Sequence, residues 1–405
     1  MHLFRFRCVP VCTSREVRSL FLVTILLLTV SLWFHFILIR KPPINNVSHT
    51  LNLSTVEKTI QARQIHFPQR LSPNHTSGVS QNHPAQDPKK PLLVLHWTEQ
   101  PGFYFHVNNS SFSGCPVSSC SATSDRKLLS IADAVVIHGH RINMSNLPSR
   151  KRPHKPYVLV WREAPPQTPS RLPLRKLDGY FDLMMAYTRD ADVLFPYGLT
   201  GEGKQTEKVP PFNASRGVRP VAWMVSHCKT VCKREQYVAQ LRHHIAVDTF
   251  GKCGERRCPD QITDCYRHLA VTHLFYLSFE NSLCDDYITE KFWLALQAGM
   301  VPVVRGPSPQ SYHRVAPPNS FIHVDEFAGP KALAAHLLAL SRNQAAYEEY
   351  HAWRNSHTLQ YPRPMCNLCH RLHYGDRPKP LRLTKLWSVA DLCHEPRDLD
   401  EESSS

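Results

Sequence analysis

The sequence predicts an α/β protein in which two Rossmann-like domains face a cleft, preceded by a single transmembrane helix and a flexible stem. Three observations lead to this prediction. A run of apolar residues lies near the N-terminus, a polar stretch follows it, and short apolar runs then alternate with helix-length segments. The 405 residues are enough for two domains of ordinary size.

Residues 20–39 form the expected membrane anchor. They are nearly all apolar and hold no Arg, Lys, Asp or Glu, and about 20 such residues span a bilayer as a helix. Several arginines precede the run, whereas only Arg40 and Lys41 follow it closely, which favours a cytosolic tail of residues 1–19. A cleaved signal peptide is the alternative, but the run is too long and no small-residue cleavage site follows it before Arg40. The rest of the chain is then expected in a lumen or outside the cell.

Residues 40–90 are expected to be a flexible stem. They are rich in Pro, Asn, Ser, Gln and His and have few large apolar residues, so they cannot bury a core. Glycosylation sequons of the Asn-x-Ser/Thr type support a luminal location and gather in the first half of the chain. The candidate sites are Asn46, Asn52, Asn74, Asn108, Asn109, Asn143 and Asn213.

Cysteine usage also indicates an oxidising compartment. Cys8 and Cys12 precede the anchor and are free or palmitoylated thiols, while eleven cysteines follow it. Because eleven is odd, at least one thiol stays free or pairs between chains. The candidates for disulfides are Cys115, Cys120, Cys228, Cys232, Cys253, Cys258, Cys265, Cys366, Cys369 and Cys393.

The spacing of Cys366 and Cys369 is also compatible with zinc or with a redox motif. A zinc site needs a second pair of ligands, and His370 and His373 are the nearest candidates. Structural disulfides are the favoured interpretation in an oxidising compartment.

Two α/β patterns follow the stem. Apolar strands are expected at 91–97, 134–138 and 157–161, within an N-terminal, acceptor-side domain of residues 91–215. A Gly-, Lys- and Pro-rich stretch then leads to a second domain of residues 216–360.

In the second domain, strands are expected at 221–225, 247–251, 273–278, 300–304 and 321–324, with helices at 231–244, 329–341 and 343–354. Residues 361–405 are expected to be an irregular, cysteine-bearing tail.

The net charge of +15 raises the question of a nucleic-acid partner. A luminal location argues against one, and the chain has no zinc-finger spacing and no basic run interleaved with aromatic residues. A basic luminal surface favours anionic ligands such as a nucleotide diphosphate or an acidic glycan.

The most informative stretch is residues 279–293, which join a buried strand to a helix. Ligands of parallel α/β sheets bind where strand C-termini meet helix N-termini. Lys291 in the first turn of this helix and Arg234 in the first turns of the preceding one are expected to clamp a diphosphate. For any single Lys or Arg, a solvated surface charge is the alternative.

The same stretch holds candidates for binding sugar and ribose hydroxyls. Glu280 and Glu290 are the carboxylates, and Asn281 and Tyr287 are the neutral partners. A solvated loop is the alternative for Glu280, and a stabilising carboxylate at a helix N-terminus is the alternative for Glu290.

These segments resemble those of the α1,3/α1,4-fucosyltransferases, glycosyltransferase family 10. The resemblance spans about residues 91–395. The segments that carry it are 279–282 (FENS), 286–293 (DYITEKFW), 187–192 (YTRDAD), 196–198 (PYG), 221–226 (VAWMVS), 321–327 (FIHVDEF) and 366–369 (CNLC).

The resemblance implies a GT-B fold, GDP-β-L-fucose as donor and inversion to an α-fucoside. It also implies a general base in the N-terminal domain, and Glu163 within 161–166 (WREAPP) matches that position, with Ala164 where the family has Ser. Donor binding carries over to Arg234, Glu280, Asn281, Tyr287, Glu290 and Lys291. His227 stands where the family usually has Asn, which puts local donor contacts in doubt.

No metal or other cofactor is expected to be required, although stimulation by Mn²⁺ or Mg²⁺ stays open. Asp190 and Asp192 have the Asp-x-Asp form that binds Mn²⁺ in another glycosyltransferase fold. They lie in the acceptor-side domain, away from the expected diphosphate site, so a structural or acceptor-facing role is expected instead.

The resemblance implies that the acceptor is a GlcNAc of glycoprotein N-glycans, and two kinds are considered. The cysteines at 228–265 and 366–393 resemble the core-type enzymes, so the Asn-linked core GlcNAc is favoured over lactosamine antennae of the Lewis type. Protein O-fucosylation and an inactive glycan-binding relative also stay open. The expected location is the Golgi membrane, as a single-pass type II protein with its catalytic domain in the lumen. The sequence gives no prediction of the oligomeric state.

Overall fold

The structure, a computed structural model, describes residues 90–98, 109–149, 155–170, 172–213, 219–258 and 262–399. These residues all fall within one compact unit, Asn82–Ser405. The expected cytosolic tail, membrane anchor and stem lie outside the described residues. Within the described ranges, no helix is both long and apolar enough to cross a membrane.

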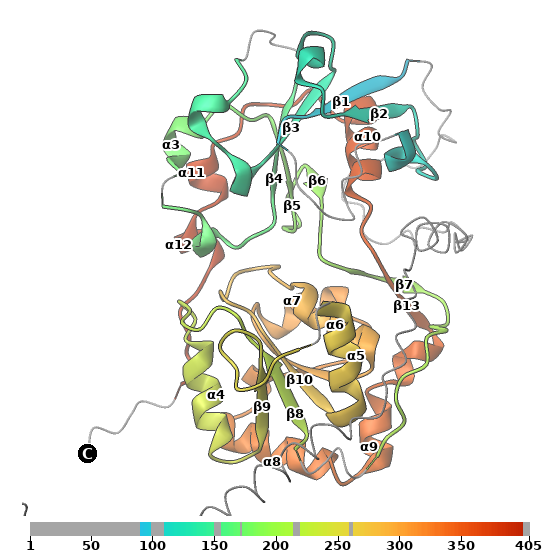
Figure 1. The fold of residues 1–405 in the computed structure, drawn as a ribbon, viewed down its shortest axis with the longest axis vertical. Helices are drawn as coiled ribbons and strands as arrows, with labels where there is room; N and C mark the ends of the chain where they lie inside the picture. The colour runs from blue at the N-terminus through green and yellow to red at the C-terminus, as the bar shows by residue number, and fades with distance from the viewer. Residues whose placement is uncertain are drawn as a thin grey trace, which may run out of the picture. The chain divides into compact units, whose positions relative to one another are not determined.

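The first part of the described chain forms a six-stranded parallel sheet in the order β2-β1-β3-β4-β5-β6 (Figure 1). Strands β3, β4 and β5 are buried along their whole length, which explains their unbroken apolar sequences. The strands are β1 Leu92–His96, β2 Cys120–Thr123, β3 Ala134–His138, β4 Tyr157–Trp161, β5 Leu183–Ala186 and β6 Val193–Leu194.

The connections in this sheet are mostly short 3₁₀ turns rather than long helices. Asp125 and Asn143 cap two of these turns through their side chains. A Rossmann-like domain would place longer helices here, and the Pro-, Asn- and Ser-rich connections do not supply them. The elements are η1 Asn109–Phe112, η2 Arg126–Ser130, η3 Gly139–Arg141, η4 Met144–Asn146, η5 Pro165–Gln167 and α3 Leu174–Leu177.

The second part forms a five-stranded parallel sheet in the order β12-β11-β10-β8-β9. The strands are β8 Val221–Met224, β9 Val247–Phe250, β10 Phe275–Phe279, β11 Val301–Arg305 and β12 Ile322–His323. The two sheets confirm the prediction of an α/β protein with two separate parallel sheets. The predicted domain limits remain predictions.

Helices cover both faces of the second sheet (Figure 1). Helices α4 and α8 pack in one apolar cluster through residues such as Leu241 and Leu337, and α5 and α6 pack in another through Leu269 and Ala295. Gly299 ends α6 with φ +87°, a left-handed conformation that favours glycine. The helices are α4 Arg234–Arg242, α5 Ile262–Thr272, α6 Glu290–Ala298, α7 Pro309–Val315, α8 Pro330–Leu340 and α9 Gln344–Glu349, with the turns η7 Val324–Glu326 and η8 Ala352–Asn355.

A small antiparallel sheet lies where the chain crosses from the first sheet to the second and back. It pairs β7, Leu199–Glu202, which follows the first sheet, with β13, His357–Gln360, which follows the second. The chain therefore returns to the first sheet after residue 360.

The prediction of an irregular tail is wrong for its first part. Residues Pro364–Tyr374 form helix α10, with Pro364 in its first turn. Met365 and Leu368 share one face of the helix and join the core of the first sheet. This helix thus supplies part of the cover that the short crossovers lack, and α11 Leu383–Leu386 and α12 Val389–Leu392 follow it.

Disulfides tie this tail to the rest of the molecule. Cys366 and Cys369 do not bond to each other; they pair with Cys115 and Cys120. The preference for disulfides over zinc is confirmed at these positions. The remaining disulfides are Cys228–Cys253, Cys258–Cys265 and Cys284–Cys393.

The prediction that Cys232 forms a disulfide is wrong. Cys232 is a buried free thiol, whose S–H donates to the carbonyl of Glu280 over 3.1 Å. Cys284, which was not a candidate, lies opposite Cys393 in an antiparallel bridge and bonds to it. The odd cysteine is therefore the one enclosed by packing, which spacing alone does not reveal.

Two of the predicted glycosylation sites can be placed. Asn143 and Asn213 are exposed. Asn46, Asn52, Asn74 and Asn108 lie outside the described residues, as does the side chain of Asn109. Use of any sequon remains a prediction.

Candidate functional site

The candidate site lies at the carboxyl end of the second sheet, where β8 and β10 are neighbours. Strand β9 lies on the other side of β8, whereas β11 and β12 lie beyond β10, so the strand order reverses between β8 and β10. Parallel α/β sheets bind ligands at such a switch point. The loop after β8 leads to Arg234 in α4, and the loop after β10 leads to Glu290 and Lys291 in α6.

Glu280, the first residue after β10, is fully buried. Its Oε1 accepts a hydrogen bond of 2.8 Å from the backbone N–H of Thr289, and its Oε2 accepts one of 2.8 Å from the Thr289 hydroxyl. Lys291 Nζ also donates to Oε2 over 3.2 Å. Burial raises the pKa of Glu280, against the opposing effect of Lys291. The solvated-loop alternative is therefore wrong, because both oxygens are held inside the protein and shape the loop. Contact of Glu280 with donor hydroxyls remains a prediction.

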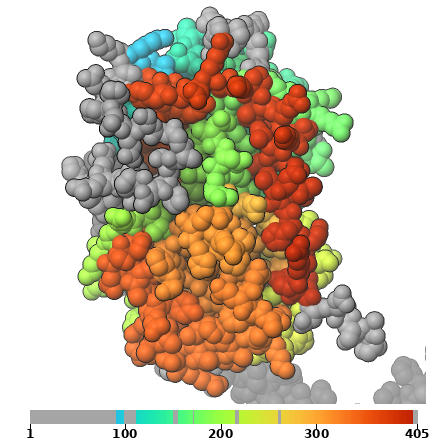
Figure 2. Space-filling view, turned by 180° about the vertical axis from the view of Figure 1, so that it is seen from behind, coloured from blue at the N-terminus to red at the C-terminus, as the bar shows by residue number. Residues whose placement is uncertain are grey.

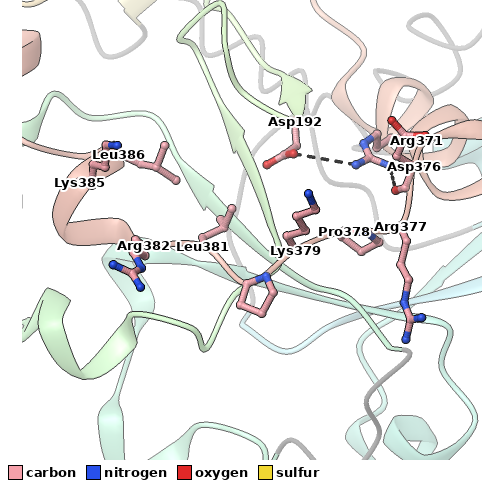
Figure 3. Close-up of a pocket in the computed structure, with 11 residues that line it drawn as sticks. Asp192, Arg371, Asp376, Arg377, Pro378, Lys379, Leu381, Arg382, Lys385 and Leu386 are labelled. Carbon is pink, nitrogen blue, oxygen red and sulfur yellow. Dashed lines mark hydrogen bonds and ion pairs between the residues drawn. The ribbon is translucent and has the colours of Figure 1, made fainter.

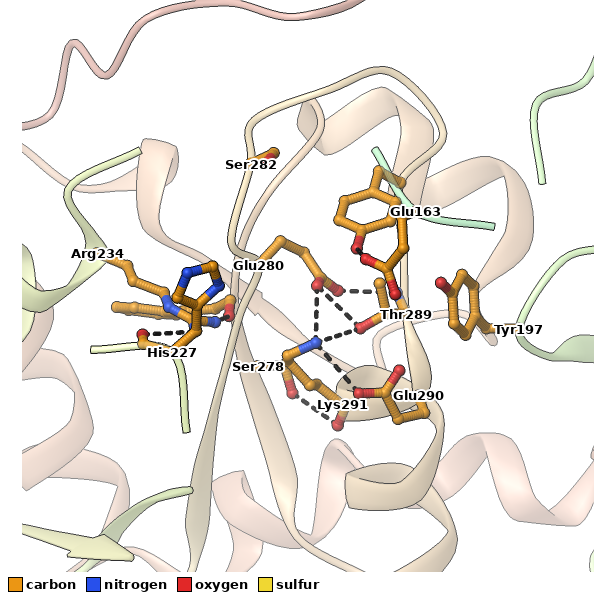
Figure 4. Close-up of polar contacts among 12 residues, drawn as sticks. Glu163, Tyr197, His227, Arg234, Ser278, Glu280, Ser282, Thr289, Glu290 and Lys291 are labelled. Carbon is orange, nitrogen blue, oxygen red and sulfur yellow. Dashed lines mark hydrogen bonds and ion pairs between the residues drawn. The ribbon is translucent and has the colours of Figure 1, made fainter. Parts of the chain in front are cut away.

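Lys291 is held between two carboxylates (Figure 4). Its ammonium donates to Glu280 Oε2, to Glu290 Oε1 over 3.2 Å and to the Thr289 hydroxyl over 2.8 Å. Burial would lower the pKa of Lys291, but the two carboxylates raise it above its ordinary value. The side chain therefore stays cationic, which a residue needs in order to bind a diphosphate.

Glu290 is the first residue of α6, and its side chain is 43% exposed. Burial alone would raise the pKa of this carboxyl, but Lys291 brings it below the usual range. An ionised, partly exposed carboxylate beside a lysine suits a ligand hydroxyl. The helix N-terminus also stabilises it, so the predicted alternative describes part of its role.

Arg234 is the first residue of α4 and is 3% exposed. Its Nη1 donates to the carbonyl of Phe279 over 2.7 Å, and its Nη2 donates to the carbonyl of His227 over 3.2 Å. Its buried Nε has no hydrogen-bond partner among the described residues. Arg234 and Lys291 are thus brought to the two sides of the Phe279–Glu280 corner (Figure 4).

The loop between Glu280 and α6 carries the two predicted neutral ligands. Asn281 is half-buried, and its Oδ1 is buried without a hydrogen-bond partner among the described residues. Tyr287 is 1% exposed, and its hydroxyl donates to Glu163 Oε2 over 2.9 Å. Burial raises the pKa of Tyr287 well above its ordinary value, so it remains a proton donor.

Glu163 comes from the first sheet, two residues after β4 ends. Its neighbour Ala164 is fully buried, so a serine there would need a hydrogen-bond partner inside the core. Glu163 is half-buried, and its Oε1 has no hydrogen-bond partner within the described part of the chain. The structure therefore places a carboxylate from the first sheet against the loop of the second.

Aromatic residues that the sequence did not single out hold this pair in place. Tyr187 and Tyr197 flank Tyr287, with ring centroids 5.1 and 6.3 Å away. The Tyr197 hydroxyl donates to the carbonyl of Arg162 over 2.5 Å, and the guanidinium of Arg162 stacks 3.8 Å above the Tyr197 ring. Their place in the matched segments was visible in the sequence, but their support of Glu163 depends on the fold.

Further contacts join the two sheets around the site. Arg189 donates through its backbone N–H and its Nε to Asp286 Oδ2, each over 3.1 Å. Gly198 lies so close to the Trp293 ring that a Cβ atom would come within 2.2 Å of it. Only glycine fits this approach.

The Asp-x-Asp segment has a structural contact. Asp192 Oδ2 accepts a hydrogen bond of 2.8 Å from the backbone N–H of Met184, and Asp190 is exposed. Asp192 also lines a basic pocket of about 430 Å³ formed with residues 371–386 (Figure 3). None of the predicted donor residues lines this pocket.

One group of side chains has the spacing of metal ligands within the described residues: Cys120, Cys369 and His373. The two cysteines are bonded to each other, and disulfide sulfurs are not the thiolates that bind zinc. These residues do not fit a zinc site.

Two sequence families match the chain. The model described as Glycosyltransferase family 10 (fucosyltransferase) C-term matches residues 215–387, and the one described as Fucosyltransferase, N-terminal matches residues 89–198.

Similar proteins come from vertebrates and an insect. Bovine alpha-(1,3)-fucosyltransferase 7 is 37% identical over 71% of this chain and 83% of its own. The 3-galactosyl-N-acetylglucosaminide 4-alpha-L-fucosyltransferase FUT3 of Pongo pygmaeus is 36% identical over 73% of this chain and 80% of its own. Alpha-(1,3)-fucosyltransferase C of Drosophila melanogaster is 34% identical over 64% of this chain and 66% of its own.

Proposed function

The chain belongs to glycosyltransferase family 10 and is a fucosyltransferase, and from this premise we propose that it transfers L-fucose from GDP-β-L-fucose to a GlcNAc hydroxyl in α1,3 linkage, with inversion and with Glu163 as base. The observation that carries the proposal is the contact between Glu163 and Tyr287, which sets a carboxylate of the first sheet against the loop that leads to Lys291. A base on one side and a cationic site on the other is what an inverting displacement requires.

In the proposed reaction, Glu163 Oε1 takes the proton of the acceptor hydroxyl. The resulting oxygen forms a bond to the anomeric carbon of fucose while the bond from that carbon to the GDP phosphate oxygen breaks, so the linkage inverts. Tyr287 holds Oε2 and orients Oε1 toward the acceptor. A fixed base in hydrogen-bond reach contributes about 10²–10⁴ in rate.

Lys291 and Arg234 compensate the negative charge that grows on the departing diphosphate. Lys291 stays protonated because of Glu280 and Glu290, and Arg234 carries a buried Nε with no partner among the described residues. Charges fixed before the reaction stabilise the leaving group without reorganisation. Glu290 and Asn281 are the proposed partners of sugar or ribose hydroxyls.

The names of the relatives guide the choice of acceptor. Human FUT5, 34% identical over 73% of this chain and 79% of its own, is named as a 3-alpha-L-fucosyltransferase acting on 4-galactosyl-N-acetylglucosaminide, which supports α1,3 transfer to a 4-galactosyl-GlcNAc antenna. The core Asn-linked GlcNAc is the second candidate. The observation that favours it is the cysteine-bearing C-terminal region, whose Cys393 lies beyond the family match, which ends at residue 387, and bonds to Cys284 within it.

We also propose a GT-B arrangement, a lumen-facing catalytic region of a type II Golgi membrane protein, and a reaction that needs no metal. The two parallel sheets support the first. The apolar run at 20–39 and the five disulfides support the second. Charge compensation by Lys291 and Arg234 supports the third, and an assay in EDTA tests it: activity that disappears and returns with Mn²⁺ would contradict it.

The proposal is tested with secreted residues 60–405, GDP-fucose and three acceptors: a galactosyl-GlcNAc oligosaccharide, an N-glycan with a bare core and a folded protein domain. Fucosylation of the first is expected, with the linkage assigned by NMR. Transfer only to the core GlcNAc would support the second candidate, and transfer only to the protein would indicate O-fucosylation. Absence of both transfer and GDP-fucose hydrolysis would indicate an inactive glycan-binding relative.

A further inference from the structure

The last described residues, 388–399, lie beyond the part of the chain that the family match covers, which ends at residue 387. They leave the first sheet beside Trp387, which packs near Trp161 and Tyr187. They then run down to the second sheet, as the red segment along the side of Figure 2 shows. We call residues 388–399 the clasp.

The clasp is first attached to the middle of the donor loop. Cys393 forms a disulfide with Cys284. Backbone hydrogen bonds flank this disulfide: Asp285 N donates to the carbonyl of Leu392 over 2.8 Å, and His394 N donates to the carbonyl of Leu283 over 2.9 Å. The loop between Glu280 and α6 is thus held on both sides of residue 284.

The second attachment lies at the base of the same loop. Asp398 accepts two hydrogen bonds from Arg305, of 2.5 Å from Nε and 2.7 Å from Nη2. The Arg305 side chain is 1% exposed. A buried guanidinium needs such a partner, because an unpaired buried charge is strongly unfavourable.

Arg305 connects the clasp to both sides of the donor site. Its carbonyl accepts from Glu280 N over 2.8 Å, and its Nη1 donates to the carbonyl of Cys232 over 2.8 Å. Cys232 lies two residues before Arg234. Arg305 therefore joins Asp398 and the loop that leads to Arg234 through its side chain, and the start of the loop that carries Asn281 and Tyr287 through its backbone carbonyl.

Between its two attachments the clasp is not tightly packed. A pocket of about 640 Å³ separates residues of the clasp, such as His394 and Arg397, from Gly306 and Phe327. The disulfide, the Arg305–Asp398 pair and the packing of Leu399 against the apolar cluster of the second sheet therefore connect the clasp to that sheet.

We propose that the clasp keeps the donor loop in its binding geometry, with Asp398 and Cys393 as positioning residues that act through Arg305 and Cys284. This inference rests on the proposed function for the loop's role in donor binding. A loop ordered before the ligand arrives binds more tightly, because the ligand does not have to supply the ordering free energy.

The test measures the affinity of the full-length chain for GDP-fucose by calorimetry. Asp398→Asn and the double variant Cys284→Ser/Cys393→Ser are each expected to weaken binding about tenfold. The matched controls are Asp391→Asn, at an exposed aspartate of the clasp, and Cys258→Ser/Cys265→Ser, which removes the disulfide between α5 and the segment before it. Both are expected within twofold of wild type. Affinities within twofold of wild type for both clasp variants would overturn the proposal.

A further variant separates positioning from stability. Arg305→Leu/Asp398→Leu removes both charges, so it is expected to regain the stability that Asp398→Asn loses while its affinity for GDP-fucose stays low. It also serves if Asp398→Asn does not fold. Wild-type affinity in this variant would show that the clasp is not needed.

Amide hydrogen exchange of residues 281–289 distinguishes failure of this proposal from failure of the proposed function. Faster exchange is expected in both clasp variants even without donor. Unchanged exchange would overturn the proposal that the clasp positions the loop. If the variants exchange faster but the wild-type protein does not bind GDP-fucose, the positioning role stands and the proposed function is contradicted.

Discussion

The hydroxyl of Tyr287 donates a 2.9 Å hydrogen bond to Oε2 of Glu163, although 124 residues separate them along the chain. The tyrosine belongs to the loop after β10 and the glutamate to the loop after β4. Since burial keeps Tyr287 protonated, one Glu163 oxygen is held and the other is left for a substrate. The contact therefore links the proposed base to the loop that is proposed to bind the donor.

Replacing Tyr287 with phenylalanine is expected to lower kcat about tenfold or more, because Glu163 loses the hydrogen bond that orients it. Initial rates at saturating donor and acceptor measure this. Tyr197→Phe is the matched control: its hydroxyl binds the carbonyl of Arg162 instead, so a smaller effect is expected. A Tyr287→Phe enzyme with the wild-type kcat would show that this hydrogen bond does not position the base.

Replacing Glu163 with glutamine is expected to lower turnover by a factor of about 10³, while GDP affinity changes less than twofold. The amide oxygen still accepts from Tyr287, so the shape of the site is kept and the basicity is lost. Single-turnover rates and calorimetry with GDP measure the two effects. Glu290→Gln provides the contrast, since it is expected to weaken donor binding more than it lowers kcat. Wild-type turnover in Glu163→Gln would assign the base to another residue.

The strands could be predicted because the sheets are parallel and buried on both faces, which leaves unbroken apolar runs such as Val158–Trp161 and Phe275–Leu277. Glu163 was predicted as the base from the resemblance of residues 161–166 to the family's segment, and the structure places it two residues after β4. The helix at Pro364–Tyr374 was missed. Its apolar face is short, and it is buried against a sheet far away in the sequence.

The roles of individual polar residues were harder to predict. Glu280 and Glu290 both look like loop carboxylates in the sequence, yet only the fold shows that Thr289 and Lys291 enclose the first. Cys232 and Cys284 could not be told apart, because pairing depends on which chain segments meet. Distances along the sequence carry no information about that.

Replacing Lys291 with methionine is expected to weaken GDP-fucose binding at least tenfold and to lower the free energy of unfolding by about 3 kcal/mol. The loss of stability arises because Glu280 is left as a buried carboxylate without its cation. Burial already raises the pKa of Glu280, and a raised carboxyl pKa gives stability that is present at low pH and lost as the pH rises through that pKa. The destabilisation should therefore shrink as the pH falls and Glu280 becomes protonated.

The double variant Lys291→Met/Glu280→Gln separates these two effects. It removes the unpaired charge, so urea unfolding should recover most of the lost stability, while GDP-fucose affinity should stay low because the cation is still missing. Donor affinity that returns with stability would mean that Lys291 supports the loop but does not contact the diphosphate.

The first sheet should lose stability in mild acid because of two neighbouring histidines. His96 and His138 end β1 and β3, their rings lie 6.4 Å apart, and each is 2% exposed. Burial lowers the pKa of His96 to about 4, and burial together with nearby positive charges, including His96, lowers that of His138 to about 3.

A histidine whose pKa is lower in the folded state contributes stability above its unfolded pKa of about 6.5 and loses it as the pH falls toward the folded pKa. Between pH 7 and pH 5 the expected loss is up to about 2 kcal/mol for each histidine. Urea unfolding at both pH values measures it, with His96→Gln and His138→Gln expected to reduce the difference and His268→Gln, exposed on α5, expected to leave it unchanged. Equal pH dependence in all four proteins would show that neither buried histidine is kept neutral by the fold.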